Sequence, residues 1–134
     1  MEFALALPLL LILTFMVTEY SRALYQYNIL AKAVRDAARY MSVQVPGDAT
    51  KYAAAKNLAV YGNPAGSGTP LALGLTTAQV SNPVWQFTGS DPVINTVTVT
   101  ITGYTFSPLF GSVFGLTFGN VTYAPISATM RAPS

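Results

Sequence analysis

The sequence predicts an α+β fold in which one long N-terminal helix carries a small head, and the head holds a short helix and an antiparallel sheet of about three strands. Apolar residues recur at helical spacing through most of the first 46 residues. Pro46–Gly47 then stops that pattern, and residues 93–104 alternate as a half-buried strand does. We therefore divide the chain into an N-terminal helix, residues 1–46, and a head, residues 47–134.

The first part of the helix is an apolar stem. Phe3 to Val17 is a run without charge, which Glu2 precedes and Glu19 follows. A full membrane span needs about 20 residues, and Thr18 and Tyr20 extend the run towards the interface. A cleaved signal peptide is the weaker interpretation, because the residues before the run are acidic and those after it continue a helix. The run predicts a membrane-embedded segment.

The second part of the helix is amphipathic. Its apolar residues return at steps of three and four, and they are Ala23, Leu24, Tyr27, Leu30, Ala31, Val34, Ala37, Ala38 and Met41. Lys32 and Asp36 have the spacing of a surface ion pair. A helix of about 44 residues would be roughly 65 Å long, which is too long for a compact domain of this size. Its apolar half must therefore be covered by lipid or by copies of itself.

The head contains one helix signal and several strand signals. Asp48 is placed to cap a helix over Ala49–Tyr61. A short strand is possible at 79–81, residues 93–104 put Val97, Val99 and Ile101 on one face, and 120–130 predicts a further strand. Helix and sheet each have one apolar face, so we expect the face of the second half of the helix to pack on these strands.

Residues 106–118 are apolar and aromatic, but their glycines and Pro108 argue against a membrane helix. This segment is either a loop packed on the sheet or an exposed patch that marks a contact surface.

Composition excludes several functions. The chain has neither Cys nor His, so it lacks thiol nucleophiles, thiolate and imidazole metal ligands and the commonest general base. Only 9% of residues are charged, well below the roughly 25% of soluble domains. The net charge of +2 is too small to indicate nucleic-acid binding. We expect no catalytic residues, no metal site, no cofactor and no enzyme activity.

Charged residues beside the stem are the best candidates for function. A carboxylate next to an apolar run is costly unless paired. Glu2 either neutralises an N-terminal amine, its own or that of an adjacent subunit, during filament assembly, or is a solvated residue at the membrane edge. Pro8 either lets the stem bend or stretch, or is ordinary for a membrane helix. Glu19 and Arg22 are spaced to pair; an exposed interfacial anchor is the favoured interpretation, and setting register between bundled helices is the alternative.

Three stretches of the sequence carry a family resemblance. They are Glu2-Phe3-Ala4-Leu5-Ala6-Leu7-Pro8 with the leucine run, Glu19-Tyr20-Ser21-Arg22-Ala23-Leu24-Tyr25, and Ala33-Val34-Arg35-Asp36-Ala37-Ala38-Arg39-Tyr40. Together they resemble the TadE-like pseudopilins of Tad-type (tight adherence) pilus systems. The C-terminal strands fit as well, whereas residues 47–92 match only in character. Pilin-like families commonly carry the glutamate fifth in the mature chain; here it is second.

The resemblance implies a structural pilin-like subunit of a type IV or Tad-type extracellular filament, which is assembled through its hydrophobic N-terminal helix and serves surface adhesion. It implies an inner-membrane precursor that becomes part of an extracellular filament. The expected partners are copies of itself, the inner membrane and the pilus assembly machinery, without nucleic acid. The expected assembly residues are Glu2, Phe3, Pro8, Glu19 and Arg22.

Two alternatives remain open at this point. The chain is either a minor, membrane-anchored pseudopilin, or a tethered surface-binding module. In the second case Trp85, Phe87 and residues 106–118 would hold glycan or cell-wall material, although a lone Trp is more often simply packed.

Overall fold

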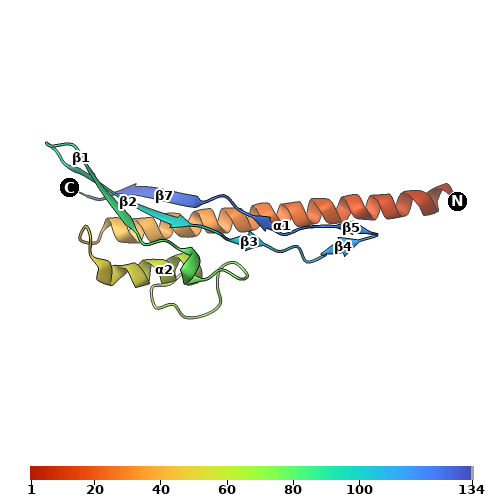
Figure 1. Cartoon of the computed structure of the whole chain (residues 1–134), viewed down its shortest axis with the longest axis horizontal. Helices are drawn as coiled ribbons and strands as arrows, with labels where there is room; N and C mark the ends of the chain where they lie inside the picture. Colours follow the sequence, from red (N-terminus) through yellow and green to blue (C-terminus); the bar gives the residue numbers. More distant parts are fainter. Residues whose placement is uncertain (134) are drawn as a thin grey trace.

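One long helix organises the molecule, which the computed structural model describes over residues 1–133 (Figure 1). Helix α1 runs from Glu2 to Ser42 and continues through Pro8 without a break. It stops before the predicted end at Pro46 because β-branched Val43 and Val45 disfavour helix, and a residue that precedes proline is restricted to extended backbone. The chain then turns, with the Gln44 N–H donating to the Met41 carbonyl.

Only the second half of α1 carries the head. Its buried apolar residues are Leu30, Ala33, Val34, Ala37, Ala38 and Met41. Leu24 and Tyr27 were predicted on the same face but are exposed. At their level the helix faces a narrow two-stranded ribbon, where the Tyr27 and Tyr123 rings form a T-shaped pair. A ribbon covers less of a helix than a sheet does.

The head packs a short helix and a sheet against α1. Asp48 caps the entry to the short helix as predicted, because its side chain accepts the Thr50 N–H at 2.9 Å. A 3₁₀ turn, Ala49–Lys51, leads into α2, Tyr52–Tyr61. The sheet has the order β1–β2–β7, all antiparallel, with β1 at Val84–Thr88, β2 at Ile94–Ile101 and β7 at Ile126–Arg131. These elements confirm the predicted α+β fold.

Two strand predictions need correction. The segment 79–81 follows a 3₁₀ turn, Thr77–Gln79, and only Val80 bridges to the sheet, at Ile101. The segment 120–130 is two strands, β6 at Val121–Thr122 and β7, because Pro125 between them has no N–H for a ladder. Strand β1 was not predicted at all.

Residues 94–131 form one long antiparallel hairpin. Its register is unchanged from Thr96 opposite Arg131, through Ile101 opposite Ile126, to Phe106 opposite Val121, where β3 (Thr105–Phe106) pairs with β6. Beyond this point β4 (Ser112–Val113) pairs with β5 (Leu116–Thr117) after a small shift of register. The end of the hairpin therefore lies far from the sheet, alongside the N-terminal half of α1 (Figure 1).

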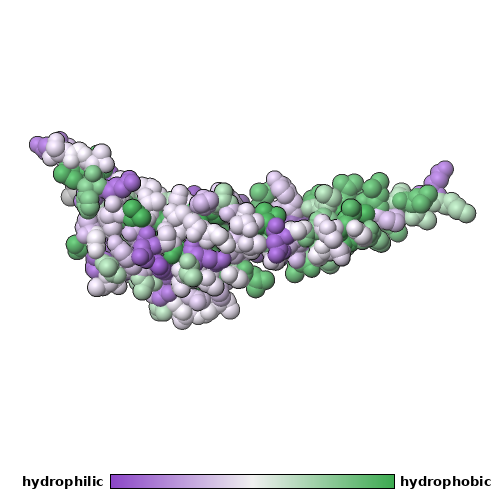
Figure 2. All heavy atoms as spheres, in the orientation of Figure 1, coloured by the Kyte–Doolittle hydropathy of each residue, from purple (hydrophilic) through white to green (hydrophobic). Residues whose placement is uncertain are grey.

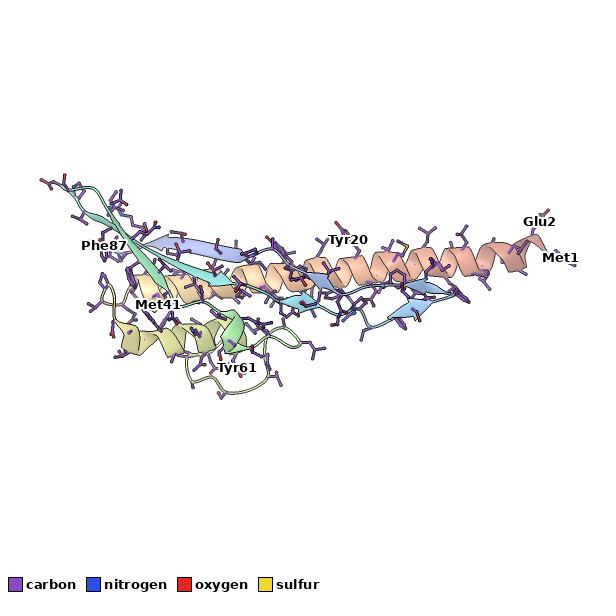
Figure 3. All side chains as sticks on the ribbon, viewed as in Figure 1. Met1, Glu2, Tyr20, Met41, Tyr61 and Phe87 are labelled. Carbon is purple, nitrogen blue, oxygen red and sulfur yellow. The ribbon has the colours of Figure 1, made fainter. Side chains whose placement is uncertain are left out.

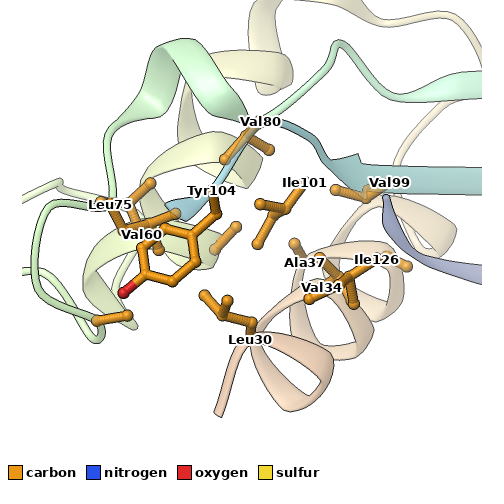
Figure 4. Packing of buried hydrophobic residues seen from close by; sticks show 13 residues of the cluster. Leu30, Val34, Ala37, Val60, Leu75, Val80, Val99, Ile101, Tyr104 and Ile126 are labelled. Carbon is orange, nitrogen blue, oxygen red and sulfur yellow. The ribbon is translucent and has the colours of Figure 1, made fainter. Parts of the chain in front are cut away.

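The core lies where α1, α2 and the sheet meet. Leu30, Val34 and Ala37 from α1 face Val60 from α2 and the buried side of β2, as Figure 4 shows. Strand β2 buries Val97, Val99 and Ile101 and leaves the intervening Thr side chains partly exposed, as its alternation predicted. The core therefore holds the head on the second half of α1 and leaves the stem projecting.

Candidate assembly site

The stem is a bare apolar surface. Its side chains are largely exposed, with Phe3 at 85%, and they form the hydrophobic half of the molecule in Figure 2. Within residues 1–133, α1 is the helix long and apolar enough to cross a membrane. Burying apolar surface is worth about 25 cal/mol per Å², so this surface needs lipid or protein around it.

Glu2 and Pro8 lie on this exposed stem. Glu2 is the first residue of α1 and projects near the tip of the molecule (Figure 3). Its negative charge is favourable beside the free N–H groups of the first helical turn. Pro8 has no N–H to donate to the Ala4 carbonyl, so one hydrogen bond is missing in a helix that is otherwise continuous. The structure places these residues but assigns them no partner among residues 1–133.

Glu19 and Arg22 form the predicted pair, but not in the predicted setting. Arg22 Nη1 lies 2.8 Å from Glu19 Oε2. The Glu19 side chain is only 6% exposed, so the interpretation of an exposed interfacial anchor is wrong for this residue. The burial comes from the end of the long hairpin, where the Leu109 backbone N–H donates to the same Glu19 oxygen at 3.3 Å.

We define the arm as residues 107–120, the part of the hairpin beyond β3 and β6. Besides the Leu109 bond, the Phe110 ring lies 4.8 Å from the Phe15 ring, between centroids. Arg22 also lies over the ring of Phe106, at the base of the arm, 5.4 Å from its centroid. The arm is thus the exposed apolar patch that was one of the two sequence interpretations, and it lies on the helix rather than on the sheet.

An apolar groove of about 320 Å³ separates α1 from the base of the arm. Glu19 is its one charged lining residue; the others are Met16, Tyr20, Ala23, Phe106, Pro108, Thr117, Phe118, Gly119 and Val121. Glu19 Oε1 is buried and has no hydrogen-bond donor among residues 1–133. The groove is therefore an apolar surface whose one charged lining residue, Glu19, keeps its unpaired oxygen buried.

Two tyrosines fasten the hairpin to α1 above this groove. The Tyr123 hydroxyl donates to the Ala23 carbonyl at 2.6 Å. The Tyr104 hydroxyl lies 2.8 Å from Gln26 Oε1 and 2.9 Å from the Leu73 carbonyl. Burial raises the pKa of both hydroxyls above the usual value. The sequence analysis missed both residues. No local sequence pattern indicates which distant helix a tyrosine beside a strand will contact.

The surface proposed for glycan binding is not assembled. Trp85 lies in β1 and packs beside the buried cluster of Met41, Ala55 and Val97. Phe87 is exposed at the end of the molecule opposite to the arm (Figures 1 and 3). Trp85 and Phe87 therefore cannot act together with residues 106–118 on one ligand. Within residues 1–133, no group of three acidic side chains is placed to hold a metal ion.

One comparison with known proteins matches the part of the chain that holds the stem and the Glu19–Arg22 pair. No curated protein and no solved structure matches the chain. The family model of the TadE-like protein matches residues 1–39, which include the stem, Glu19 and Arg22. This match confirms the resemblance predicted from the sequence: the first 39 residues of the chain are similar to TadE-like proteins.

Proposed function

We propose that this chain is a pilin-like structural subunit of a Tad-type extracellular filament, which the stem holds in the inner membrane before assembly and which serves surface adhesion afterwards. One observation carries the proposal. The TadE-like segment coincides with an apolar stem that the rest of the chain leaves exposed. Its partners are lipid first and copies of itself later, with the pilus assembly machinery moving it between the two.

The stem suits both environments for the same physical reason. A bilayer interior and a bundle of apolar helices are similarly apolar, so moving the stem between them loses little hydrophobic free energy. Between its two end turns, the backbone groups of α1 are bonded within the helix in either place, apart from the Ala4 carbonyl opposite Pro8. In this proposal Glu2 marks the end of the stem and registers it against a neighbouring subunit.

Electron microscopy of sheared cell-surface material tests the proposal. An epitope inserted between Gly68 and Thr69, both exposed in the head, reports the chain without touching the stem. Label at regular intervals along filaments is the expected result. Filaments that never contain the tagged chain, with label confined to the membrane fraction, contradict the proposal and favour a minor, membrane-anchored pseudopilin instead.

A matched pair of variants shows whether the stem holds the filament together. Leu10→Ala with Leu13→Ala removes packing side chains yet keeps the stem uncharged, so membrane insertion should persist while filament yield falls. Leu73→Ala removes the same side chain from the head, where Leu73 is 80% exposed, and should leave the yield unchanged. Equal yields from both variants would mean that the stem is only an anchor.

A further inference from the structure

The tip of the arm holds an aromatic residue in a strained conformation. Phe114 and Gly115 form the two-residue turn between β4 and β5, and their φ angles are +50° and +82°. A hairpin turn with two positive φ values favours Asn-Gly, and a bulky residue there costs on the order of 1 kcal/mol. Phe114 is 63% exposed, so packing within the chain does not offset this strain. The fold of a single copy gives no reason for a phenylalanine at this position.

The whole arm presents an apolar surface at the level of the stem. From Pro92 to Met130 the chain has no charged residue. Leu109, Phe114 and Leu116 are all exposed on the arm, and the Phe110–Phe15 contact holds the arm along α1. Water is therefore an unfavourable neighbour for the arm, just as it is for the stem.

Lipid is also an unfavourable neighbour, because of the backbone. Strands β4 and β5 pair only with each other, so the outer edge of each has N–H and C=O groups without ladder partners. Each such group costs several kcal/mol in hydrocarbon, and irregular backbone occurs at that depth only where protein covers it. These edges favour protein as the neighbour of the arm.

The stem itself carries a surface that matches the tip. An open groove of about 380 Å³ on the far part of α1 is lined by Phe3, Ala6, Leu7, Leu9, Leu10 and Leu13, all of them apolar. No residue of the arm lines this groove, so the chain does not fill its own groove with its own tip. A protruding apolar knob and an unfilled apolar groove therefore lie on different parts of one molecule.

We propose that Phe114 of one copy packs into the stem groove of a second copy. Knob and groove are different surfaces, so the contact is heterologous and repeats from copy to copy, as a filament requires. The inference rests on the proposed function and deepens it: the arm becomes a second contact between subunits, in addition to packing between stems. The contact also offsets the strain at Phe114, which packing within one copy does not do.

Disulfide cross-linking tests the contact directly, because the chain has no cysteine of its own. Cells would express two differently tagged full-length chains, one with Leu116→Cys, an exposed position beside the turn that keeps Phe114, and the other with Leu10→Cys. Mild oxidation of the intact sheared filaments should yield a product with both tags, which can only join two copies. A control pair replaces Leu10→Cys by Ser90→Cys, at the exposed turn between β1 and β2, and should yield at least tenfold less. Equal yields, or no product with both tags, would overturn the inference.

A second variant tests the same contact without risk to the fold. Phe114→Asn suits the positive φ and keeps the turn, so the hairpin should persist while filament yield falls at least tenfold. Phe87→Asn changes an equally exposed phenylalanine in β1 and should leave the yield unchanged. Normal yield from Phe114→Asn refutes the role of the arm and leaves the proposed function intact.

Two further outcomes separate the causes of failure. If the wild-type chain forms no filaments, the proposed function and this inference both fail. If a fluorophore on Leu116→Cys is quenched by brominated lipid in the membrane fraction while filaments show no cross-link, the arm contacts lipid and the inference is wrong.

Discussion

Glu19 interrupts a stretch of α1 that is otherwise uncharged from Phe3 to Ser21, and the arm folds over it. Its carboxylate has two partners, the Arg22 guanidinium and the Leu109 N–H, and both reach the same oxygen. A hydrogen bond to a charged group contributes about 1.5–3 kcal/mol, more than most single contacts at a surface. Glu19 therefore has a structural task within one copy, whatever it contacts in an assembly.

We predict that Glu19→Ala frees the arm from α1. Leu109 loses its acceptor and Arg22 its counter-charge, so the Leu109 amide should exchange with solvent about 10–100-fold faster, as the loss of about 1.4–2.8 kcal/mol requires. Hydrogen exchange on the full chain in detergent measures this. Glu19→Gln keeps an acceptor oxygen and should show a smaller change. Unchanged exchange in Glu19→Ala would mean that aromatic contacts alone hold the arm.

Glu2→Ala should permit membrane insertion and impair assembly. The change removes the charge at the end of the stem without shortening the apolar run, so lipid still accepts the helix. Membrane fractionation and filament yield would be measured on the same cells. Glu2→Gln, which keeps the size of the side chain, shows whether the charge matters. Normal filaments from both variants would leave Glu2 as a solvated residue at the membrane edge.

Stability should fall in alkaline solution because of Tyr104 and Tyr123. Burial raises the pKa of both hydroxyls above the value of about 10 that they have in an unfolded chain. Below that pH the full contribution is present; above it the unfolded chain loses protons that the folded chain retains, so unfolding becomes more favourable. Thermal melts from about pH 8 to pH 11 measure the effect. A double variant, Tyr104→Phe with Tyr123→Phe, should show a weaker dependence on pH.

Helix α1 combines two surfaces that change at about the middle of its length. The stem half is apolar all round and exposed, as expected of a helix surrounded by lipid or by other helices. The second half buries one stripe against α2, β2 and β7 and leaves its charged side exposed. A single unbroken helix therefore transmits the position of the stem to the head without a hinge.

The buried stripe of α1 can be checked with neighbouring substitutions. Val34 is fully enclosed by the core, so Val34→Asp should cost several kcal/mol as an unpaired buried charge. Arg35 is exposed, and Arg35→Ala should cost less than about 0.5 kcal/mol. Thermal unfolding of the full chain in detergent compares the two. The reverse ranking would show that α1 is rotated in its contact with the sheet.

At the scale of the molecule, the chain is elongated because the apolar stem and the apolar arm lie side by side, outside the core of the head. The stem and the arm both project from the head in the same direction (Figures 1 and 2). Residues distant in sequence thus form one continuous apolar region beyond Glu19.

Deleting residues 1–21 should leave a folded head that associates through its arm. The deletion removes Phe15 and Glu19, the α1 contacts of Phe110 and Leu109, but it spares every apolar core residue. Circular dichroism should show the fold, and sedimentation should show association that depends on concentration. Replacing residues 107–120 by Asn-Gly, which joins β3 to β6 by a short turn, should give a monomer. Loss of folding in both forms would mean that the head needs the stem.

Local patterns predicted much of this architecture. The alternation of Val97, Val99 and Ile101 identified β2 and its buried face, and Asp48 marked the start of the short helix, because period and capping are properties of neighbouring residues. Strand β1 was missed because Trp85 and Phe87 lie on an edge strand that is largely exposed, so hydrophobic alternation is weak there. The pair Glu19–Arg22 was found from its spacing of three residues, but its burial was not, because the residues that bury Glu19 come from a distant part of the sequence.

The sequence alone was enough to establish a long helix with an apolar first half, a small α+β head and a TadE-like N-terminal segment, since all three depend on residues close together along the chain. Only the tertiary structure decided that residues 94–131 are one hairpin, that its end lies on α1, and that Leu109 buries Glu19 across a separation of 90 residues. Glycine and proline in residues 106–118 excluded a helix but left the direction of the chain open. That direction depends on the register of strands far away in the sheet, which no local pattern records.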